Sequence, residues 1–327
     1  MGNFQGAMRI LAPFSLLLVS LAQGLAGQAP AGRPIPLRIV ADRLYATPVT
    51  LRGDTLLFYL DTGGGANMVY ERALPRLGTA AEWMRTDGDS TRVAAMPAFT
   101  REASIPAPGR ASFTGERLMV FPAPNDETLD DGFLGRTWFA DRIWVIDYPA
   151  ASLSLLEMGA SAPAVPAAHR VPLGFKVNAT GQRMMHFPRI RVEIDGDSLD
   201  LLFDTGAMVV LTDPALAALG DGGPRIRGTS FIAENVFNRW RRRHPGWRVI
   251  EHADRTIDMP MIEVPHITLG GHQVGPVWFT VRPDRSFHEY MSQWMDQRIE
   301  GALGGSAFKY FRITLDYPRA TAGLARP

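Results

Sequence analysis

The chain of 327 residues contains no cysteine. Disulfide bonds, cysteine nucleophiles, cysteine metal ligands and lipidation of an N-terminal cysteine are therefore excluded. The seven histidines include no His-x-x-x-His pair, so the helical zinc motif is absent. Neither a Gly-x-Ser-x-Gly elbow nor a phosphate-cradling glycine loop is present. We expect no metal and no cofactor.

The chain also lacks an excess of charge of either sign. Lys and Arg together number 34 and Asp and Glu 33, which leaves a formal net charge of +1. A protein that binds nucleic acid or an anionic membrane surface usually carries a strongly basic patch. We therefore expect no nucleic-acid partner, and bulk electrostatics do not select the substrate.

Long hydrophobic runs are missing after the N-terminal region. Residues 8–26 have a basic start at Arg9, an apolar centre and a small-residue end at Gly24-Leu25-Ala26, which is the layout of a secretory signal peptide. The apolar run is interrupted by Pro13 and falls short of the roughly 18 to 20 residues that span a bilayer. We predict a signal peptide over residues 1–26, export to the periplasm or the medium, and no membrane contact after its removal. An uncleaved N-terminal anchor is the alternative.

The chain does contain one motif that occurs twice. Residues 53–63 and 196–206 each read as a Gly-Asp turn, an apolar strand and Asp-Thr-Gly. The glycine stands eight positions before the aspartate in both copies, Asp61 and Asp204, so the strand length is preserved with the motif. A carboxylate at the end of a buried strand is costly unless something compensates it. One such carboxylate in each half indicates that each half completes the other's site.

A second pair of markers follows in each half. Phe133-Leu134-Gly135 precedes an Asp-Tyr-Pro sequence at Asp147, and Ala302-Leu303-Gly304 precedes another at Asp316. The glycine and the aspartate are twelve residues apart both times. This shared register indicates an internal duplication.

The paired motifs resemble the pepsin and retropepsin superfamily of aspartic proteases, specifically a bacterial two-lobed member. The resemblance covers most of the chain after the N-terminal region. It implies an all-β fold with a few short helices and a cleft between two lobes. It also implies that Asp61 and Asp204 are catalytic. Supporting roles are implied for the residues beside and behind them, which are Thr62, Gly63, Thr205, Gly206, Gly135 and Gly304.

In that family the two threonines would hydrogen-bond across the lobe interface, and glycine after each threonine permits close backbone approach. The chain departs from the pepsin branch at Gly64 and Ala207, where pepsins usually carry a hydroxyl. The first copy also has an extra glycine, Gly65, because Leu74 lies thirteen residues past Asp61 and Leu216 twelve past Asp204. Small residues at these positions are more similar to the retropepsin branch.

The domain division follows from composition. Residues 159–169 are rich in Ala and Pro and read as a linker between an N-terminal lobe, 27–158, and a C-terminal lobe, 170–327. Short apolar segments separated by Gly, Pro and Asp predict many short strands. The turn Asp87-Gly88-Asp89 predicts a β-hairpin at the place of the family's mobile flap. An ordinary surface hairpin is the alternative.

The second half is longer between motif and glycine, with 100 residues from Asp204 to Gly304 against 74 from Asp61 to Gly135. We assign the excess to insertions within 221–262 and 286–299, either of which could border the cleft. Residues 230–244 have helical spacing and end in three arginines that favour the helix dipole; a docking face for an acidic peptide is the alternative. Residues 286–289 read as a capping box.

The sequence therefore predicts an exported aspartic endopeptidase, a monomer that acts on peptide or protein substrates with a water activated between Asp61 and Asp204. A catalytically weak or inactive peptide-binding protein is the alternative, and single-lobe units acting in a larger assembly are a third possibility. Intact aspartates in both halves favour the protease, because a pure binder has no need of two repelling carboxylates. The linker and the full motif in each half favour pairing within one chain.

Overall fold

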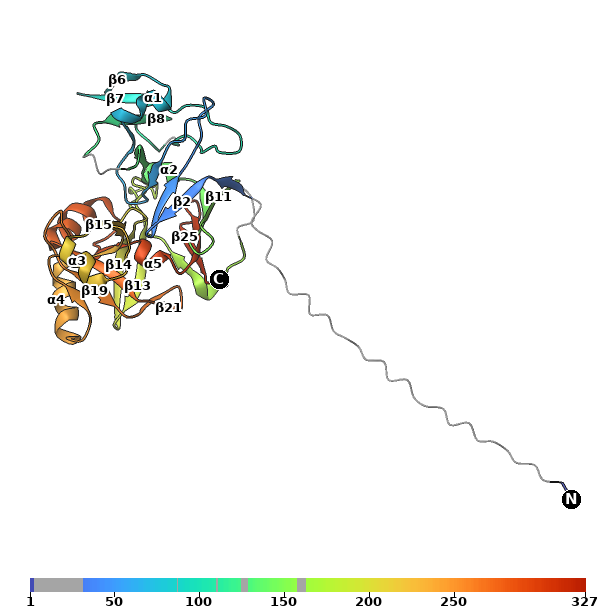
Figure 1. The fold of residues 1–327 in the computed structure, drawn as a ribbon, viewed down its shortest axis with the longest axis vertical. Coiled ribbons are helices and arrows are strands. Elements are labelled where there is room, and N and C mark those ends of the chain that lie inside the picture. The colour runs from blue at the N-terminus through green and yellow to red at the C-terminus, as the bar shows by residue number, and fades with distance from the viewer. Residues whose placement is uncertain (3–31, 87, 110, 125–128, 158–162) are drawn as a thin grey trace.

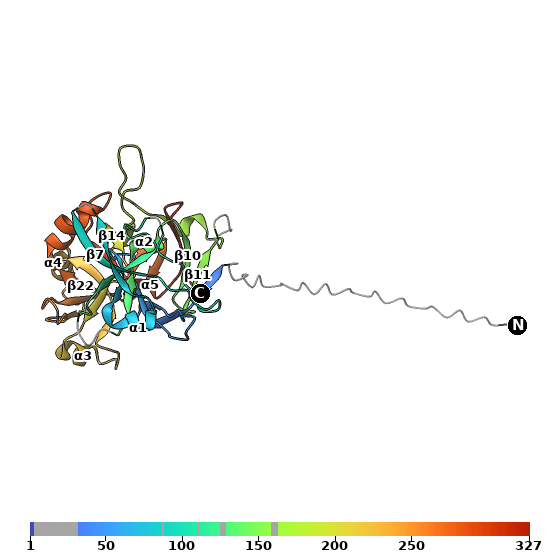
Figure 2. The same cartoon turned by 90° about the horizontal axis from the view of Figure 1, so that it is seen from above.

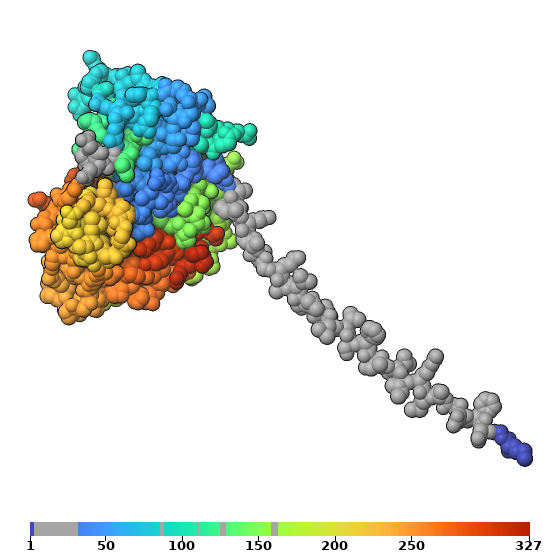
Figure 3. Space-filling view, in the orientation of Figure 1, coloured from blue at the N-terminus to red at the C-terminus, as the bar shows by residue number. Residues whose placement is uncertain are grey.

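The computed structural model describes residues 1–2, 32–86, 88–109, 111–124, 129–157 and 163–327. These residues form two lobes built mainly of β-strands, with the first half of the chain above the second in Figures 1 and 3. The predicted all-β, two-lobed architecture is confirmed. The predicted signal peptide lies outside the described residues except for Met1 and Gly2. No helix in the described ranges is long and apolar enough to cross a membrane.

The first lobe is organised on an eight-stranded sheet. Its strands, in spatial order, are β2 (Leu37–Val40), β3 (Arg43–Ala46), β4 (Phe58–Leu60), β9 (Gly132–Leu134), β5 (Asn67–Tyr70), β8 (Arg117–Phe121), β7 (Asp89–Ala95) and β6 (Ala81–Thr86). Thr86 pairs with Asp89, so β6 and β7 form the predicted hairpin with a two-residue loop. Gly88 in that loop has a φ of 89°, which suits a hairpin turn. Asp87 lies outside the described residues.

The second lobe has a nine-stranded sheet. Its strands, in spatial order, are β18 (Val249–Ile250), β19 (Met261–Val264), β22 (Val277–Arg282), β17 (Ser230–Ala233), β23 (Gly301–Leu303), β14 (Asp197–Phe203), β13 (Arg189–Ile194), β20 (Ile267–Leu269) and β21 (His272–Val274).

The two sheets repeat one topology around the motifs. The motif strand β4 runs parallel to β9, and its counterpart β14 runs parallel to β23. On the far side, β5 pairs antiparallel with β9 and parallel with β8, and β17 pairs in the same senses with β23 and β22. Asp61 and Asp204 therefore follow equivalent central strands, each next to the strand that ends at Gly135 or Gly304.

The strand that follows the motif comes much later in the second lobe. In the first lobe β5 begins at Asn67, six residues after Asp61, whereas β17 begins at Ser230, 26 residues after Asp204. Twenty of the 26 additional residues of the second half therefore lie directly after the motif. They form β15 (Met208–Val210), α3 (Asp213–Leu219) and β16 (Ile226–Gly228), with β15 and β16 paired to each other.

This arrangement corrects the sequence analysis in two respects. Most of the extra length lies between the second motif and β17, largely before the segments 221–262 and 286–299 to which the sequence analysis assigns it. Leu74 begins α1 after β5, but Leu216 lies in α3 inside the inserted segment. The sequence comparison treated these two leucines as equivalent positions one residue out of step. In the structure they are not equivalent.

A six-stranded sheet joins the lobes. Its order is β1 (Arg33–Ile35), β11 (Ser152–Leu156), β10 (Ile143–Asp147), β24 (Arg312–Asp316), β25 (Thr321–Ala325) and β12 (Arg170–Pro172). The central pair β10 and β24 comes from the two Asp-Tyr-Pro segments of the duplication. Figure 2 shows β10 and β11 side by side near the C-terminus. The predicted linker is described only from Pro163 and leads through η2 (Ala167–His169) into β12.

The tip of the β2–β3 hairpin also reaches the second lobe. Ala41 and Asp42 form its turn with positive φ angles of 47° and 65°. The backbone N–H of Gly228 donates to the Ala41 carbonyl oxygen at 2.7 Å. The Asp42 carboxylate lies 3.6 Å from the Lys309 ammonium group. This hairpin thus holds the first lobe against the end of the inserted segment.

Short helices cover the sheets. They are η1 (Glu71–Ala73), α1 (Leu74–Leu77), α2 (Arg136–Phe139), α4 (Glu234–Arg243), η3 (Ser286–Met291), η4 (Ser292–Trp294) and α5 (Gly305–Phe308). The helix predicted within 230–244 is α4, which buries Val236, Phe237 and Trp240. The predicted capping box at Ser286 is wrong, because the N-cap of η3 is Arg285 and no side chain caps it.

Candidate active site

The two motif aspartates meet at the interface between the lobes. Asp61 and Asp204 follow β4 and β14, and their carboxyl groups are within hydrogen-bonding reach of each other. Asp204 is 9% exposed, and Asp61 is partly exposed to a cavity. A hydrogen bond between two carboxyl groups requires that one of them carries a proton. The geometry therefore suits a pair that shares a single proton.

Each carboxyl group is held by the backbone of its own motif. The N–H of Gly63 donates to Asp61 Oδ1 at 2.9 Å, and the N–H of Gly206 donates to Asp204 Oδ1 at 2.9 Å. The equal distances show that the duplication extends to atomic detail. These donors fix the orientation of both side chains and leave the second oxygen of each available for other partners.

The same two glycines face the aspartate of the opposite lobe. A Cβ atom added at Gly63 would lie 2.7 Å from Asp204 Cγ. One added at Gly206 would lie 2.6 Å from Asp61 Oδ2 and still closer to Cγ of that residue. A side chain at either position would occupy the space of a carboxyl group, so glycine is required by close approach and not by an unusual φ angle.

Burial governs the protonation of the pair. Removal from water raises the pKa of Asp61 above the ordinary value of 3.8, against the opposing effect of the Gly63 and Gly64 N–H groups. Burial raises the pKa of Asp204 well above 3.8, and the negative charge of Asp61 raises it further. Because two adjacent carboxylates repel each other, the second ionisation is the disfavoured one.

The motif threonines connect the lobes through their hydroxyl groups. Thr62 Oγ1 donates to the carbonyl oxygen of Phe203 at 2.7 Å and accepts from the N–H of Thr205 at 3.0 Å. Thr205 Oγ1 donates to the carbonyl oxygen of Leu60 at 2.9 Å and accepts from the N–H of Thr62 at 3.1 Å. All four bonds are buried, so they fix the distance between the two motifs.

Gly135 and Gly304 stand directly behind the motif loops. A Cβ atom at Gly135 would lie 2.7 Å from the carbonyl oxygen of Gly64, and one at Gly304 would lie 2.7 Å from Ala207 Cβ. Both glycines thus pack against the turn that follows the motif. The structure brings together all eight residues that the sequence analysis named as catalytic or supporting.

Four buried polar residues behind these glycines were not found from the sequence. The N–H of Gly135 donates to Asn67 Oδ1 at 2.9 Å, and Asn67 Nδ2 donates to Thr137 Oγ1 at 2.8 Å. In the second lobe the N–H of Gly304 donates to Ser230 Oγ at 3.0 Å, and Ser230 Oγ lies 3.0 Å from Ser306 Oγ. A hydroxyl two residues after each glycine, at Thr137 and Ser306, is a repeat that the sequence already displays.

Arg136 supports the loop that carries the extra glycine. Its guanidinium group donates to the carbonyl oxygens of Gly64 and Gly65 and lies over the ring of Phe187, 4.3 Å from the ring centroid. Phe187 belongs to the second lobe, so this arginine links the first motif loop to both halves.

A cavity of about 410 Å³ opens beside the aspartates. The first lobe contributes Asp61, Tyr59 and Arg43 to its lining, and the second contributes Gly206 with Met208 and Ile226 of the inserted segment. Arg255 and Thr256 also line it, so the predicted insertion 221–262 borders the site. None of the described lining residues comes from the β6–β7 hairpin, whose role as a flap stays a prediction.

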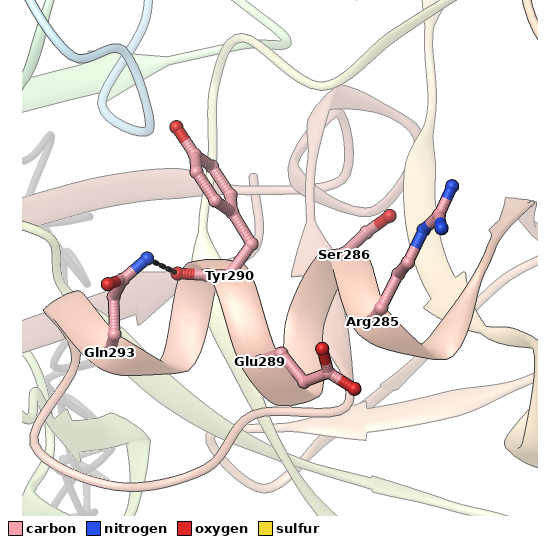
Figure 4. A pocket seen from close by; sticks show the side chains of 5 residues that line it. All are labelled: Arg285, Ser286, Glu289, Tyr290 and Gln293. Carbon is pink, nitrogen blue, oxygen red and sulfur yellow. Dashed lines mark hydrogen bonds between the residues drawn. The ribbon is translucent and has the colours of Figure 1, made fainter.

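The predicted insertion 286–299 lies elsewhere. No described lining residue of the cavity beside the aspartates comes from this segment. It has a shallow pocket of its own, shown in Figure 4, whose five lining residues all come from the segment around η3 and η4. In that view Tyr290 projects away from the helix, and Gln293 Nε2 donates to its carbonyl oxygen at 2.9 Å. We find nothing there that continues the aspartate site.

The arginines at the end of α4 are engaged within the protein. Arg241 pairs with Glu251 at 2.8 Å, and Arg243 lies 3.2 Å from Asp197. These contacts occupy two of the three guanidinium groups that we considered as a docking face for an acidic peptide. Among the described residues, no group of three or more His, Asp or Glu side chains could hold a metal ion.

Comparison with known proteins supports the fold. No protein-family model matches the chain, and no curated protein matches it. Among solved structures, the chain is similar to the aspartic proteinase from Irpex lacteus, with a TM-score of 0.51 and 11% sequence identity over 90% of this chain and 97% of that one. At this identity the likeness shows the fold alone. The fold is that of a pepsin-like aspartic proteinase.

Proposed function

We propose that the protein is an exported aspartic endopeptidase that hydrolyses peptide bonds by means of Asp61 and Asp204. The observation that carries the proposal is the pair of carboxyl groups, one from each lobe, within hydrogen-bonding reach at the edge of a cavity. Burial of two carboxyl groups that repel each other costs free energy, and carboxyl groups with perturbed pKa values are typical of catalytic sites. The shared fold with an aspartic proteinase is consistent with this proposal.

The proposed reaction uses the pair as acid and base together. The ionised member removes a proton from a water as that water attacks the peptide carbonyl carbon, and the protonated member donates to the carbonyl oxygen. The tetrahedral intermediate then collapses as the amide nitrogen takes a proton and the C–N bond breaks. No covalent intermediate with the protein forms. The N–H groups of Gly63 and Gly206 keep both carboxyl groups oriented throughout.

Export is the second part of the proposal. It is supported by the basic, apolar and small-residue order of residues 8–26. N-terminal sequencing of the protein from fractionated cells tests it. A mature chain that begins near Gly27 in the periplasm or the medium supports export, whereas an intact chain in the membrane fraction favours the N-terminal anchor.

A peptide-library experiment tests the activity. The purified protein is incubated with diverse peptides at several pH values, and the products are identified by mass spectrometry. We expect internal cleavage by the parent and none by Asp61→Asn or Asp204→Asn, because either change deletes a group that must exchange protons. Asp213→Asn is the matched control, since the Asp213 side chain is 85% exposed and pairs with Arg225 on the inserted segment.

The outcome separates the competing functions. Cleavage that persists in either dyad variant would refute the catalytic assignment. A parent that binds peptides but cleaves none at any pH would identify the protein as a peptide-binding protein with a protease-like cleft. Sedimentation analysis of the parent tests the proposed monomer against the larger assembly.

A further inference from the structure

A nearly buried guanidinium group lines the cavity beside the aspartates. Arg43, in β3, is 6% exposed, and its Nε has no hydrogen-bond partner within the described ranges. Its Nη1 is 3.6 Å from Met208 Sδ, a weak acceptor. No carboxylate oxygen of the described ranges lies within 4.0 Å of it, although Asp130, which lines the same cavity, is near enough for the charge of Arg43 to act on its carboxyl group. The guanidinium group is thus placed among aromatic rings, 5.1 Å from the ring centroid of Tyr45 and 5.6 Å from that of Tyr59.

A second unpartnered polar group faces the same cavity. Tyr59 is 7% exposed, and its hydroxyl group is buried without a hydrogen-bond partner in the part of the chain that the structure describes. Tyr59 precedes Asp61 by two residues, and alternate residues of a strand share one face. The hydroxyl and the Asp61 carboxyl group therefore belong to the same side of β4. The charge of Asp61 and burial both raise the pKa of Tyr59, so the hydroxyl keeps its proton and remains a donor.

Burial of the Arg43 guanidinium group and the Tyr59 hydroxyl group costs free energy unless a ligand forms hydrogen bonds with them. Buried charges in proteins are almost always paired, because desolvation of an unpaired ion is expensive. A guanidinium group binds a carboxylate through two parallel hydrogen bonds, and a phenol can add a third. Apolar side chains of the inserted segment, Met208 and Ile226, also line the cavity and suit the methylene groups of such a ligand.

We propose that this pocket selects an acidic side chain, Asp or Glu, on the substrate residue next to the cleaved bond. The inference rests on the proposed function and adds to it the class of substrate. The carboxylate of that residue accepts from Arg43 and from the Tyr59 hydroxyl group. Because the pocket is continuous with Asp61 and Gly206, its occupant is adjacent to the bond that reacts.

Other charged residues in the pocket determine the pH at which an acidic ligand is favoured. Asp130 also lines it, and burial raises the pKa of its carboxyl group, which reduces repulsion of an acidic ligand at mildly acidic pH. Arg255 adds positive charge on the side of the second lobe. A substrate Glu with an ordinary pKa of about 4.3 is ionised above about pH 5, so the preference is measured there.

The test uses matched peptides that differ only in Glu, Gln or Leu at each position flanking the cleaved bond. For one of the two positions we expect the parent to cleave the Glu peptide with a kcat/KM at least about tenfold above that of the Gln peptide. Arg43→Met keeps the length of the side chain and should abolish this preference, so that the Glu and Gln peptides are cleaved with equal kcat/KM. Arg38→Met is the matched control, because Arg38 is exposed on the neighbouring strand β2 and does not line the cavity.

Tyr59→Phe provides a second variant that removes only a hydroxyl group without a partner. It should fold as the parent does and lower kcat/KM for the Glu peptide about fivefold relative to Gln. Equal cleavage of Glu and Gln peptides by the parent at both positions, or a Glu preference unchanged in both variants, would overturn the inference while leaving the proposed function intact.

If no peptide is cleaved, the proposed function fails and calorimetric binding of the same peptides decides the inference. A dissociation constant about tenfold lower for Glu than for Gln, lost in Arg43→Met, would sustain the pocket as a site for an acidic residue. Equal affinity, or no binding of either peptide, would overturn it.

Discussion

Substitution of Gly206 by alanine is the sharpest test of the contact between the lobes. The new Cβ would lie 2.6 Å from Asp61 Oδ2, whereas ordinary contact begins at 3.4 Å. The Asp61 carboxyl group therefore has to move by at least 0.8 Å, the difference between these two distances. A misplacement of about 1 Å in a catalytic group can cost about 100-fold in rate. We expect kcat/KM for a cleaved peptide to fall by about this factor.

The neighbouring glycines provide a graded series of controls. A Cβ at Gly63 would lie 2.7 Å from Asp204 Cγ, so Gly63→Ala should also be severely impaired. A Cβ at Gly65 would meet only the Arg136 guanidinium group at 3.6 Å, an ordinary contact, although the residue belongs to the same loop. Gly65→Ala should thus retain activity within about threefold of the parent.

Steady-state kinetics on one peptide, with circular dichroism to verify folding, measures the series. Full activity of Gly206→Ala would refute the close approach of Gly206 and Asp61. Equal loss in Gly65→Ala would show that the loop tolerates no methyl group anywhere, and the argument from contact distance would fail.

Three further predictions concern protonation and the lobe interface. Because burial raises the pKa of Asp204 in the folded protein, the folded state loses stability as pH rises through that value, by about 1.4 kcal/mol for each pK unit. Asp204→Asn removes this cost, so it should melt higher than the parent near neutral pH and equally at acidic pH; a lower melting temperature at neutral pH would contradict the assignment. Activity should follow a bell-shaped pH profile whose acidic limb lies above 3.8, since both carboxyl pKa values are raised; strong activity at about pH 2 with none at about pH 5 would count against it. Thr62→Val leaves the buried N–H of Thr205 and the carbonyl of Phe203 without this partner, so chemical denaturation should show a loss of about 3 kcal/mol, whereas Thr62→Ser should retain most of the stability.

The repeat made much of the fold predictable. Strand length, motif and the later glycine recur at fixed spacing, and each is a local feature that a single sequence displays. The pairing of the motif strand with the strand before Gly135 or Gly304 follows from the duplication, because equivalent segments occupy equivalent places. The cross-lobe bonds of Thr62 and Thr205 were expected from the family resemblance and occur in the structure.

The place of the next strand could not be predicted from the sequence. Met208-Val209-Val210 follows the second motif as directly as Met68-Val69-Tyr70 follows the first, and both are apolar and suited to a strand. Local propensity does not decide which segment takes the place beside β23. Ser230, at the start of β17, accepts a hydrogen bond from the N–H of Gly304. This long-range bond identifies β17 as the strand that pairs with β23.

The cavity residues were missed for a related reason. Arg43 and Tyr59 carry no motif, and a lone arginine or tyrosine in a strand usually needs no functional explanation. Only the packing of β3 beside β4, together with the absence of a partner for either polar group among the described residues, distinguishes them. Such a signal does not exist before the fold is known.

The duplication and its main exception divide the site into two parts. The dyad, the motif glycines and the threonines obey the repeat, as they must if the two carboxyl groups exchange the roles of acid and base. The inserted segment interrupts the repeat directly after the second motif, and its residues Met208 and Ile226 form an apolar wall of the cavity that contacts Arg43 through Met208. In the proposed function the chemistry depends on the symmetric part, whereas the inserted segment, together with Arg43 and Tyr59 of the first lobe, forms the pocket that selects the substrate. Changes in the wall should therefore alter which peptides are cleaved before they alter the pH dependence of cleavage.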